Sequence, residues 1–61
     1  MYNVSFRYRD ETEIGCGIMQ WLPRIGEKVI LNSVPLVIYD IVYMLKNGTT
    51  NTIDVRVYVH L

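Results

Sequence analysis

The feature that most constrains this chain is an alternation of apolar and polar residues at both of its ends. Near the start, every second residue is apolar: Tyr2, Val4, Phe6 and Tyr8. Near the end, the same spacing returns at Ile53, Val55, Val57, Val59 and Leu61. A period of two places alternate side chains on opposite faces of a β-strand, so that one face can be buried. We therefore predict a strand that begins at Tyr2 and another from Thr52 to Leu61.

A second predicted strand follows the polar, turn-like segment 9–12 and pairs with the first as a hairpin. Its apolar residues, Ile14, Cys16 and Ile18, alternate with Gly15 and Gly17. We expect Cys16 to face the core as a small hydrophobic residue. The two glycines leave their face without side chains, which predicts either a close approach of another backbone or a sharp bend of the strand.

Two more strands are predicted in the middle of the chain. A structured loop with a proline and a glycine leads into a short strand from Lys28 to Asn32, and Asn32-Ser33 is a candidate tight turn. The run from Val34 to Lys46 is nearly all apolar and rich in Val, Ile and Tyr, which favours a long strand. A helix from Leu36 to Leu45 is the alternative.

The pairing of the last two strands depends on the loop at Asn47-Gly48. A two-residue turn there would place Val55 across from Asp40, with a carboxylate in an apolar row. A longer loop, or a bulge at Gly48, pairs odd residues with odd ones and lets Asp40 face Arg56, which is the register we prefer because a buried lone carboxylate is costly. The apolar residues that lie together in that register are Tyr43, Ile41 and Tyr39 with Ile53, Val55 and Val57.

Size and composition limit the class of protein. A chain of 61 residues buries only about 60% of the surface that it exposes when unfolded. It is 51% hydrophobic with a net charge of zero, so we expect one folded domain over residues 1–61 that bulk charge does not draw to nucleic acid or an anionic membrane. A single cysteine provides neither an internal disulfide nor a zinc site. Extra stability should therefore come from packing or self-association.

Leader sequences, membrane spans and catalytic sets are all missing from the sequence pattern. There is no basic leader with a cleavage site, and no apolar run approaches the roughly 20 residues that span a membrane. The only histidine, His60, is next to the last residue, so a pair with Cys16 would depend on a chain end. We predict a cytoplasmic protein without a membrane partner, enzymatic activity, metal or cofactor.

Five short antiparallel strands predict an all-β fold, either a small five-stranded antiparallel barrel or a strongly bent meander. The segment Trp21-Leu22-Pro23-Arg24-Ile25-Gly26-Glu27-Lys28-Val29, followed by Leu36, Ile38 and Ile41, resembles the Pro-x-x-Gly-Asp/Glu-x-Val and apolar-x-Val-x-x-Val pattern of SH3-like β-barrel proteins, including small phage and bacterial ones. Because Ile38 and Ile41 are three residues apart, the resemblance implies a bulge near Tyr39-Asp40 that changes the inward face. It implies a fold and no catalytic residues.

The long apolar strand carries two apolar rows, and a small barrel has room for one of them. A second copy of the chain is the simplest cover for the other row, although the bends of a tight barrel could also use both rows. The residues predicted to line this interface are Leu36, Ile38, Asp40, Val42 and Met44.

These observations predict a non-catalytic homo-oligomeric binding protein of phage or mobile-element origin, which binds a host protein or sequesters a small ligand. The alternatives are a nucleic-acid-binding barrel or a small structural or assembly subunit. A ligand site would combine an aromatic ring with a guanidinium group. The predicted ligand-binding residues are Trp21, Arg24 and Tyr58, with Arg7 and Arg9 as second choices.

Overall fold

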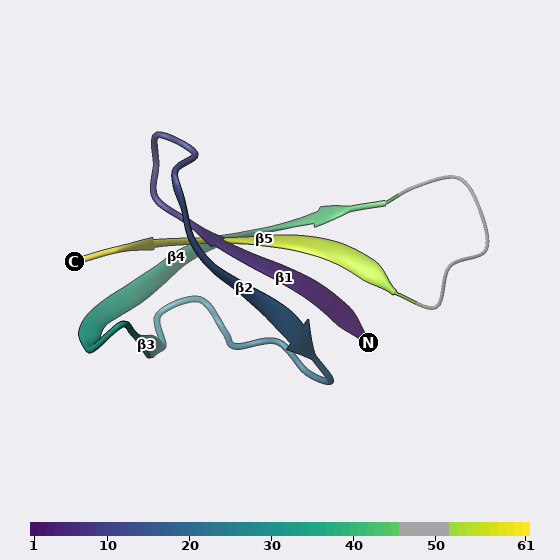
Figure 1. Ribbon diagram of the computed structural model, residues 1–61, viewed down its shortest axis with the longest axis horizontal. Helices are drawn as coiled ribbons and strands as arrows, with labels where there is room; N and C mark the ends of the chain where they lie inside the picture. Colours follow the sequence, from purple (N-terminus) through teal and green to yellow (C-terminus); the bar gives the residue numbers. More distant parts are fainter. Residues whose placement is uncertain (46–51) are drawn as a thin grey trace.

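The computed structural model describes residues 1–45 and 52–61, and in these residues the regular structure consists of five strands. They are β1 (Tyr2–Arg7), β2 (Glu13–Met19), β3 (Lys28–Leu31), β4 (Val34–Met44) and β5 (Ile53–His60). The strands form one sheet in the order β2-β1-β5-β4-β3, curled into a half-barrel (Figure 1). The all-β prediction is confirmed, and β4 is a strand rather than the alternative helix.

The two strands with the clearest alternation, β1 and β5, lie side by side and run parallel. Val4 lies opposite Val55 and Phe6 opposite Val57, whereas the other three ladders are antiparallel. The sheet is therefore mixed, where the sequence pattern predicted antiparallel pairs only. A parallel pair needs a long connection between its strands, and here the chain from β2 to β4 supplies it.

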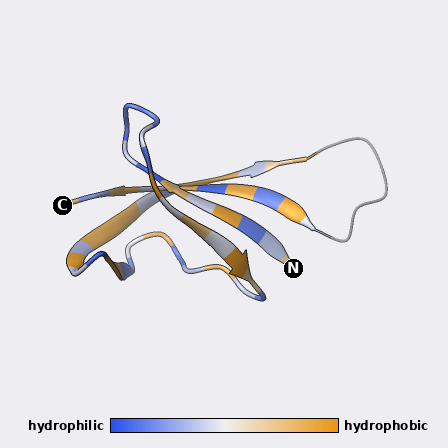
Figure 2. Ribbon diagram, in the orientation of Figure 1, coloured by the Kyte–Doolittle hydropathy of each residue, from blue (hydrophilic) through white to orange (hydrophobic). Residues whose placement is uncertain are grey.

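The core follows the inward rows of the alternating strands. Figure 2 shows hydrophobic and hydrophilic residues alternating along β5. The buried residues, each 8% exposed or less, are Val4, Phe6, Leu36, Ile38, Val55, Val57 and Val59. The outward row of β1 and β5 is polar, so this part of the sheet has one face toward the core and one toward solvent.

A bulge at Tyr39 divides β4 into two parts. Ile38 lies opposite Val59 and Asp40 opposite Tyr58, which leaves Tyr39 as the extra residue. The inward side chains change parity at this point, because Leu36 and Ile38 are buried before the bulge and Ile41 packs against the core after it. The bulge implied by the three-residue spacing of the isoleucines is thus present.

The preferred register of β4 and β5 has the right parity after the bulge only, and its pairs are wrong. There odd residues do face odd ones, but Tyr43 lies opposite Val55 and Ile41 opposite Val57, two residues further along β5 than predicted; before the bulge, Ile38 lies opposite Val59. The Asp40–Arg56 pair does not form, because Asp40 lies opposite Tyr58 and its Oδ1 accepts the backbone N–H of Ile41 at 2.9 Å. The loop at Asn47-Gly48, on which this prediction depended, lies outside the described residues.

Of the three residues predicted on the core face of β2, Ile14 packs against the core, but Cys16 and Ile18 are exposed. Phe6 lies opposite Gly15 and Arg7 opposite Glu13, so Ile14 is an extra residue and the parity of β2 changes there. Cys16 is exposed as a result, which corrects the prediction of a buried cysteine. The face of Gly15 turns inward, where the side chain of Leu31 from β3 lies 3.8 Å from the position of a Cβ. This is an ordinary van der Waals distance, and a Cβ at Gly17 would meet nothing within 4 Å, so the close backbone approach predicted at the two glycines is not present.

Two turns lead into and out of β3. Asn32 and Ser33 both have positive φ, 52° and 66°, which is the backbone of the tight hairpin turn expected there. Before β3, Gly26 has a φ of 95° and donates its N–H to the carbonyl of Ile38 at 2.8 Å. Glycine adopts this conformation without strain. The hydrogen bond from Gly26 to Ile38 lies directly before the first β3–β4 pair, Lys28 with Val37.

Candidate ligand pocket and its surroundings

The parallel pairing of β1 and β5 brings the carboxyl ends of the two strands to the same edge. A pocket of about 630 Å³ lies there, a volume typical of small-molecule sites. The residues after β1, the end of β5 and the bulge of β4 line it together. These residues are Tyr8, Arg9, Asp10, Tyr39, Val59, His60 and Leu61.

Aromatic rings gather around Tyr39, the bulge residue. Its ring centroid lies 5.4 Å from that of His60 and 6.3 Å from that of Tyr58, and both pairs are tilted by 46°. The guanidinium carbon of Arg9 lies 6.0 Å from the centre of the same ring, at the outer limit of a cation–π contact. The bulge therefore places the ring of Tyr39 beside His60 at the end of β5 and beside Arg9, which follows β1.

The two charged side chains of the pocket have different surroundings. The Asp10 carboxylate accepts the backbone N–H of Thr12 at 3.0 Å, and this bond lowers the pKa of Asp10 below its ordinary value. Asp10 is thus an anion held by its own turn. Arg9 has no ion pair with a carboxylate in residues 1–45 and 52–61.

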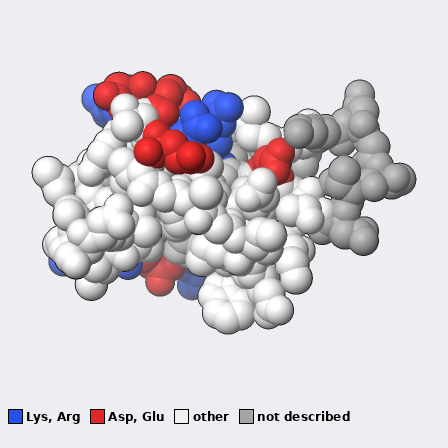
Figure 3. Space-filling view, viewed as in Figure 1, with Lys and Arg blue, Asp and Glu red and all other residues white. Residues whose placement is uncertain are grey.

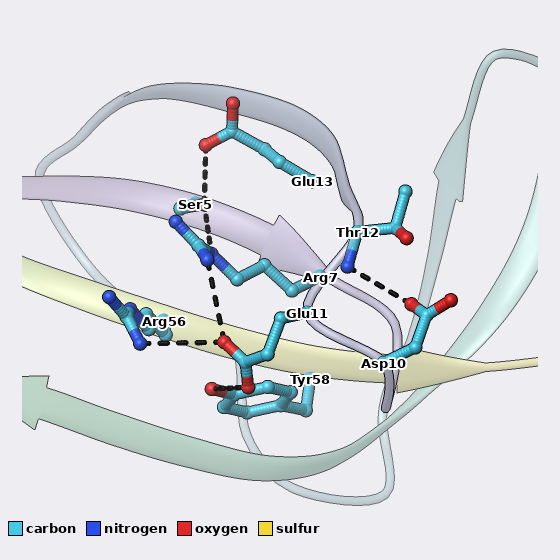
Figure 4. A network of polar contacts seen from close by, with 8 residues as sticks. All are labelled: Ser5, Arg7, Asp10, Glu11, Thr12, Glu13, Arg56 and Tyr58. Carbon is cyan, nitrogen blue, oxygen red and sulfur yellow. Dashed lines mark hydrogen bonds and ion pairs between the residues drawn. The ribbon is translucent and has the colours of Figure 1, made fainter.

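Next to the pocket, Glu11 is the centre of a polar network (Figure 4). Its carboxylate lies 3.4 Å from a guanidinium nitrogen of Arg7 and 3.4 Å from one of Arg56. It also accepts the hydroxyl of Tyr58 at 2.6 Å, and this bond raises the pKa of Tyr58, because it stabilises the protonated phenol. Glu11 holds this position with a φ of 74°, in the left-handed region.

The network continues over the outer face of β1 and β2. Ser5 donates to Glu13 at 2.5 Å and accepts from Nε of Arg7 at 3.0 Å. In Figure 3 the charged side chains gather over the turn between β1 and β2, and most of the rest of this face is uncharged. Arg7 and Arg56 are therefore engaged with carboxylates of the same chain.

The predicted ligand residues lie in three separate places. Trp21 and Arg24 share a shallow hollow of about 520 Å³ in the loop between β2 and β3. Arg7 and Tyr58 belong to the Glu11 network, and only Arg9 lines the pocket. Within one copy of the chain, Trp21 and Arg24 lie apart from the other three residues, which are on or directly after the paired strands β1 and β5. That these residues bind a ligand stays a prediction.

Sequence reasoning missed six of the seven residues of the pocket, among them the three that carry rings: Tyr8, Tyr39 and His60. Each is on a strand end or a bulge, where the simple alternation stops predicting a direction for the side chain. His60 was set aside as part of a free chain end, although it lies in β5 with its ring against Tyr39. The spacing of Ile38 and Ile41 is the one signal that pointed toward Tyr39.

The predicted interface residues of β4 also divide. Leu36 and Ile38 are each 1% exposed and belong to the core, so they cannot line a surface. Asp40, Val42 and Met44, after the bulge, are exposed. The prediction is thus wrong for the first two residues. The even-numbered residues of β4 point inward before Tyr39, and the extra residue there makes the later ones point outward.

No protein-family model, curated protein or solved structure matches this chain. The described residues hold no group of three or more His, Cys, Asp or Glu that could bind a metal ion. Residues 1–45 and 52–61 also contain no helix that could cross a membrane.

Proposed function

We propose that this chain is a non-catalytic binding protein that assembles with copies of itself. The observation that carries the proposal is an apolar surface on the outside of β3 and β4, which we call the β3–β4 outer face. Its apolar residues are Ile30, Pro35, Val37, Val42 and Met44, and the charged residues Lys28 and Asp40 lie on the same face. Ile30 lies opposite Pro35 on the neighbouring strand and is 74% exposed, although it is a large aliphatic side chain.

The β3–β4 outer face differs from the rest of the outer sheet surface. Val42 and Met44 lie opposite Arg56 and Asp54 of β5. From these two residues onward, across β5 and β1, the outward side chains are polar. Figure 2 shows the first part of β4 as strongly hydrophobic. Apolar side chains on the outer face of a strand favour contact with another apolar surface over contact with water.

A second copy of the chain fits this surface for two reasons. The face carries charges of both signs, since Lys28 lies opposite Val37 near its middle and Asp54 lies opposite Met44 at its far end. Two copies related by a two-fold axis can therefore place unlike charges beside each other. A standard interface covers about 800 Å² per partner, which is under a fifth of the 4617 Å² surface of this chain.

The nucleic-acid alternative has less support from the charges. Arg7 and Arg56 both lie against Glu11, so that two of the arginines that would contact phosphates face a carboxylate already. The chain as a whole has no excess of positive charge.

The test is the mass of the protein in solution by light scattering, with Ile30→Lys against Ile18→Lys. Both positions are similarly exposed, at 74% and 68%, but Ile18 is on β2, away from the β3–β4 outer face. We expect the unchanged protein and Ile18→Lys to be oligomeric at about 100 µM and Ile30→Lys to be monomeric, because a buried ammonium at the interface is costly. A monomeric unchanged protein, or equal masses for the two variants, contradicts the proposal.

A further inference from the structure

We propose that the pocket at the ends of β1 and β5 binds a small planar aromatic anion. The proposal rests on the binding role proposed above and does not depend on self-association. Three features carry it: the volume of the pocket, the rings that line it, and the charge of Arg9.

The walls of the pocket suit a planar ring. Tyr8 and Tyr39 contribute phenol rings, His60 an imidazole, and Val59 an aliphatic side chain. The ring of Tyr39 also lies 6.3 Å from that of Tyr58, which is itself anchored through its hydroxyl to Glu11. A ring that its neighbours already hold loses little conformational freedom when a ligand stacks on it.

The pocket is lined by one negative and one positive side chain, Asp10 and Arg9. The Asp10 carboxylate keeps its charge, but it accepts the backbone N–H of Thr12, and Figure 4 shows it turned toward that residue. Arg9, in contrast to Arg7 and Arg56, has no carboxylate partner in the described part of the chain. A carboxylate, phosphate or sulfonate on the ligand would give Arg9 an anionic partner, which the guanidinium can bind in bidentate geometry.

The position of Arg9 joins the two features. Its guanidinium lies over the ring of Tyr39, at 6.0 Å from the centroid, and its side chain is exposed. When the guanidinium moves outward to an anion, the ring face beneath it becomes available for stacking. One side-chain movement therefore prepares both contacts, which favours ligands that carry the ring and the anion in one molecule.

The experiment compares four probes by isothermal titration calorimetry. The first, 2-naphthoate, has an aromatic ring and a carboxylate. Its uncharged amide, 2-naphthamide, lacks the anion, and cyclohexanecarboxylate lacks the aromatic ring. Adenosine monophosphate tests whether a ring and a phosphate are accepted in a larger molecule. We expect 2-naphthoate and adenosine monophosphate to bind, and the amide and cyclohexanecarboxylate to bind at least tenfold more weakly than 2-naphthoate.

Variants locate the site. We expect Arg9→Met to weaken 2-naphthoate binding at least tenfold and to leave the affinity for 2-naphthamide unchanged. The matched control is Arg24→Met, which removes another exposed arginine beside an aromatic residue, in the Trp21 hollow, and should change neither affinity. Circular dichroism confirms that both variants fold, since both positions are exposed.

Several results would overturn the proposal. They are no 2-naphthoate binding at millimolar concentration, equal affinities for 2-naphthoate and its amide, or an equal loss in Arg24→Met. Binding of a single-stranded oligonucleotide without binding of any small probe would also overturn it, in favour of a nucleic-acid surface. Repeating the titration with Ile30→Lys separates the two proposals: we expect the same affinity in this variant, and an affinity that depends on the oligomer contradicts an independent site.

Discussion

The two parts of β4, before and after Tyr39, differ little in composition and greatly in burial. Ile38, before the bulge, is 1% exposed, whereas Val42, four residues further on, is 37% exposed. In a regular strand these two even-numbered residues would share one face. They do not, because the extra residue at Tyr39 shifts the pairing with β5 by one position.

This comparison shows that hydrophobicity alone does not decide which residues of an apolar strand are buried. Leu36 and Ile38 reach the core because they lie on the same face as Val57 and Val59 of the neighbouring strand. Val42 and Met44 are as apolar but lie beside the outward residues Arg56 and Asp54. One bulge thus produces both a core and an apolar outer surface from a single strand.

The largest expected difference within β4 is between a lysine placed before the bulge and a lysine placed after it. Ile38→Lys buries an ammonium among valines, which costs several kcal/mol and exceeds what a small core supplies. We expect no cooperative thermal transition by circular dichroism for Ile38→Lys and a folded protein for Val42→Lys. Equal behaviour of the two variants would show that the parts of β4 do not differ in burial.

Deletion of Tyr39 removes the bulge itself and should have a smaller effect. In the shortened strand, Leu36, Ile38 and Ile41 fall on one regular row, so the same residues still face β5 and the core. The ring contacts of Tyr39 are lost, and we expect a cost of about 0.5–1.5 kcal/mol in the free energy of unfolding. Chemical denaturation measures it; failure to fold would mean that the half-barrel requires the bend at the bulge.

The smallest effect is expected at Asp40, the charged residue beside the bulge. Its carboxylate accepts the N–H of Ile41, so Asp40→Ala should cost about 0.5–1 kcal/mol, while Asp40→Asn retains an acceptor and should cost less. Denaturant midpoints of the two variants test this order. Equal losses in the two variants would mean that the negative charge, which both remove, contributes rather than the acceptor, and a changed oligomer mass would place Asp40 in the interface.

Part of the fold and little of the site could be predicted from the sequence. The strands were found from alternation and β-branched residues, and the turn at Asn32-Ser33 was found from its residue types. The bulge in β4 was implied by the spacing of Ile38 and Ile41. The bulge at Ile14, by contrast, exposed Cys16 without any local signal, because a bulge depends on which residue the partner strand places opposite.

The sequence by itself determined the class of structure, because a period of two in side-chain polarity is satisfied only by half-buried strands. It also determined that the chain has more apolar side chains than a small core can bury. Only the tertiary structure decided that β1 pairs with β5 in parallel, and with it the pocket of Tyr8, Arg9, Tyr39 and His60. The physical reason is that backbone hydrogen bonds carry no residue identity: many partners satisfy a strand's ladder, and the choice among them depends on how the side chains of all five strands pack together.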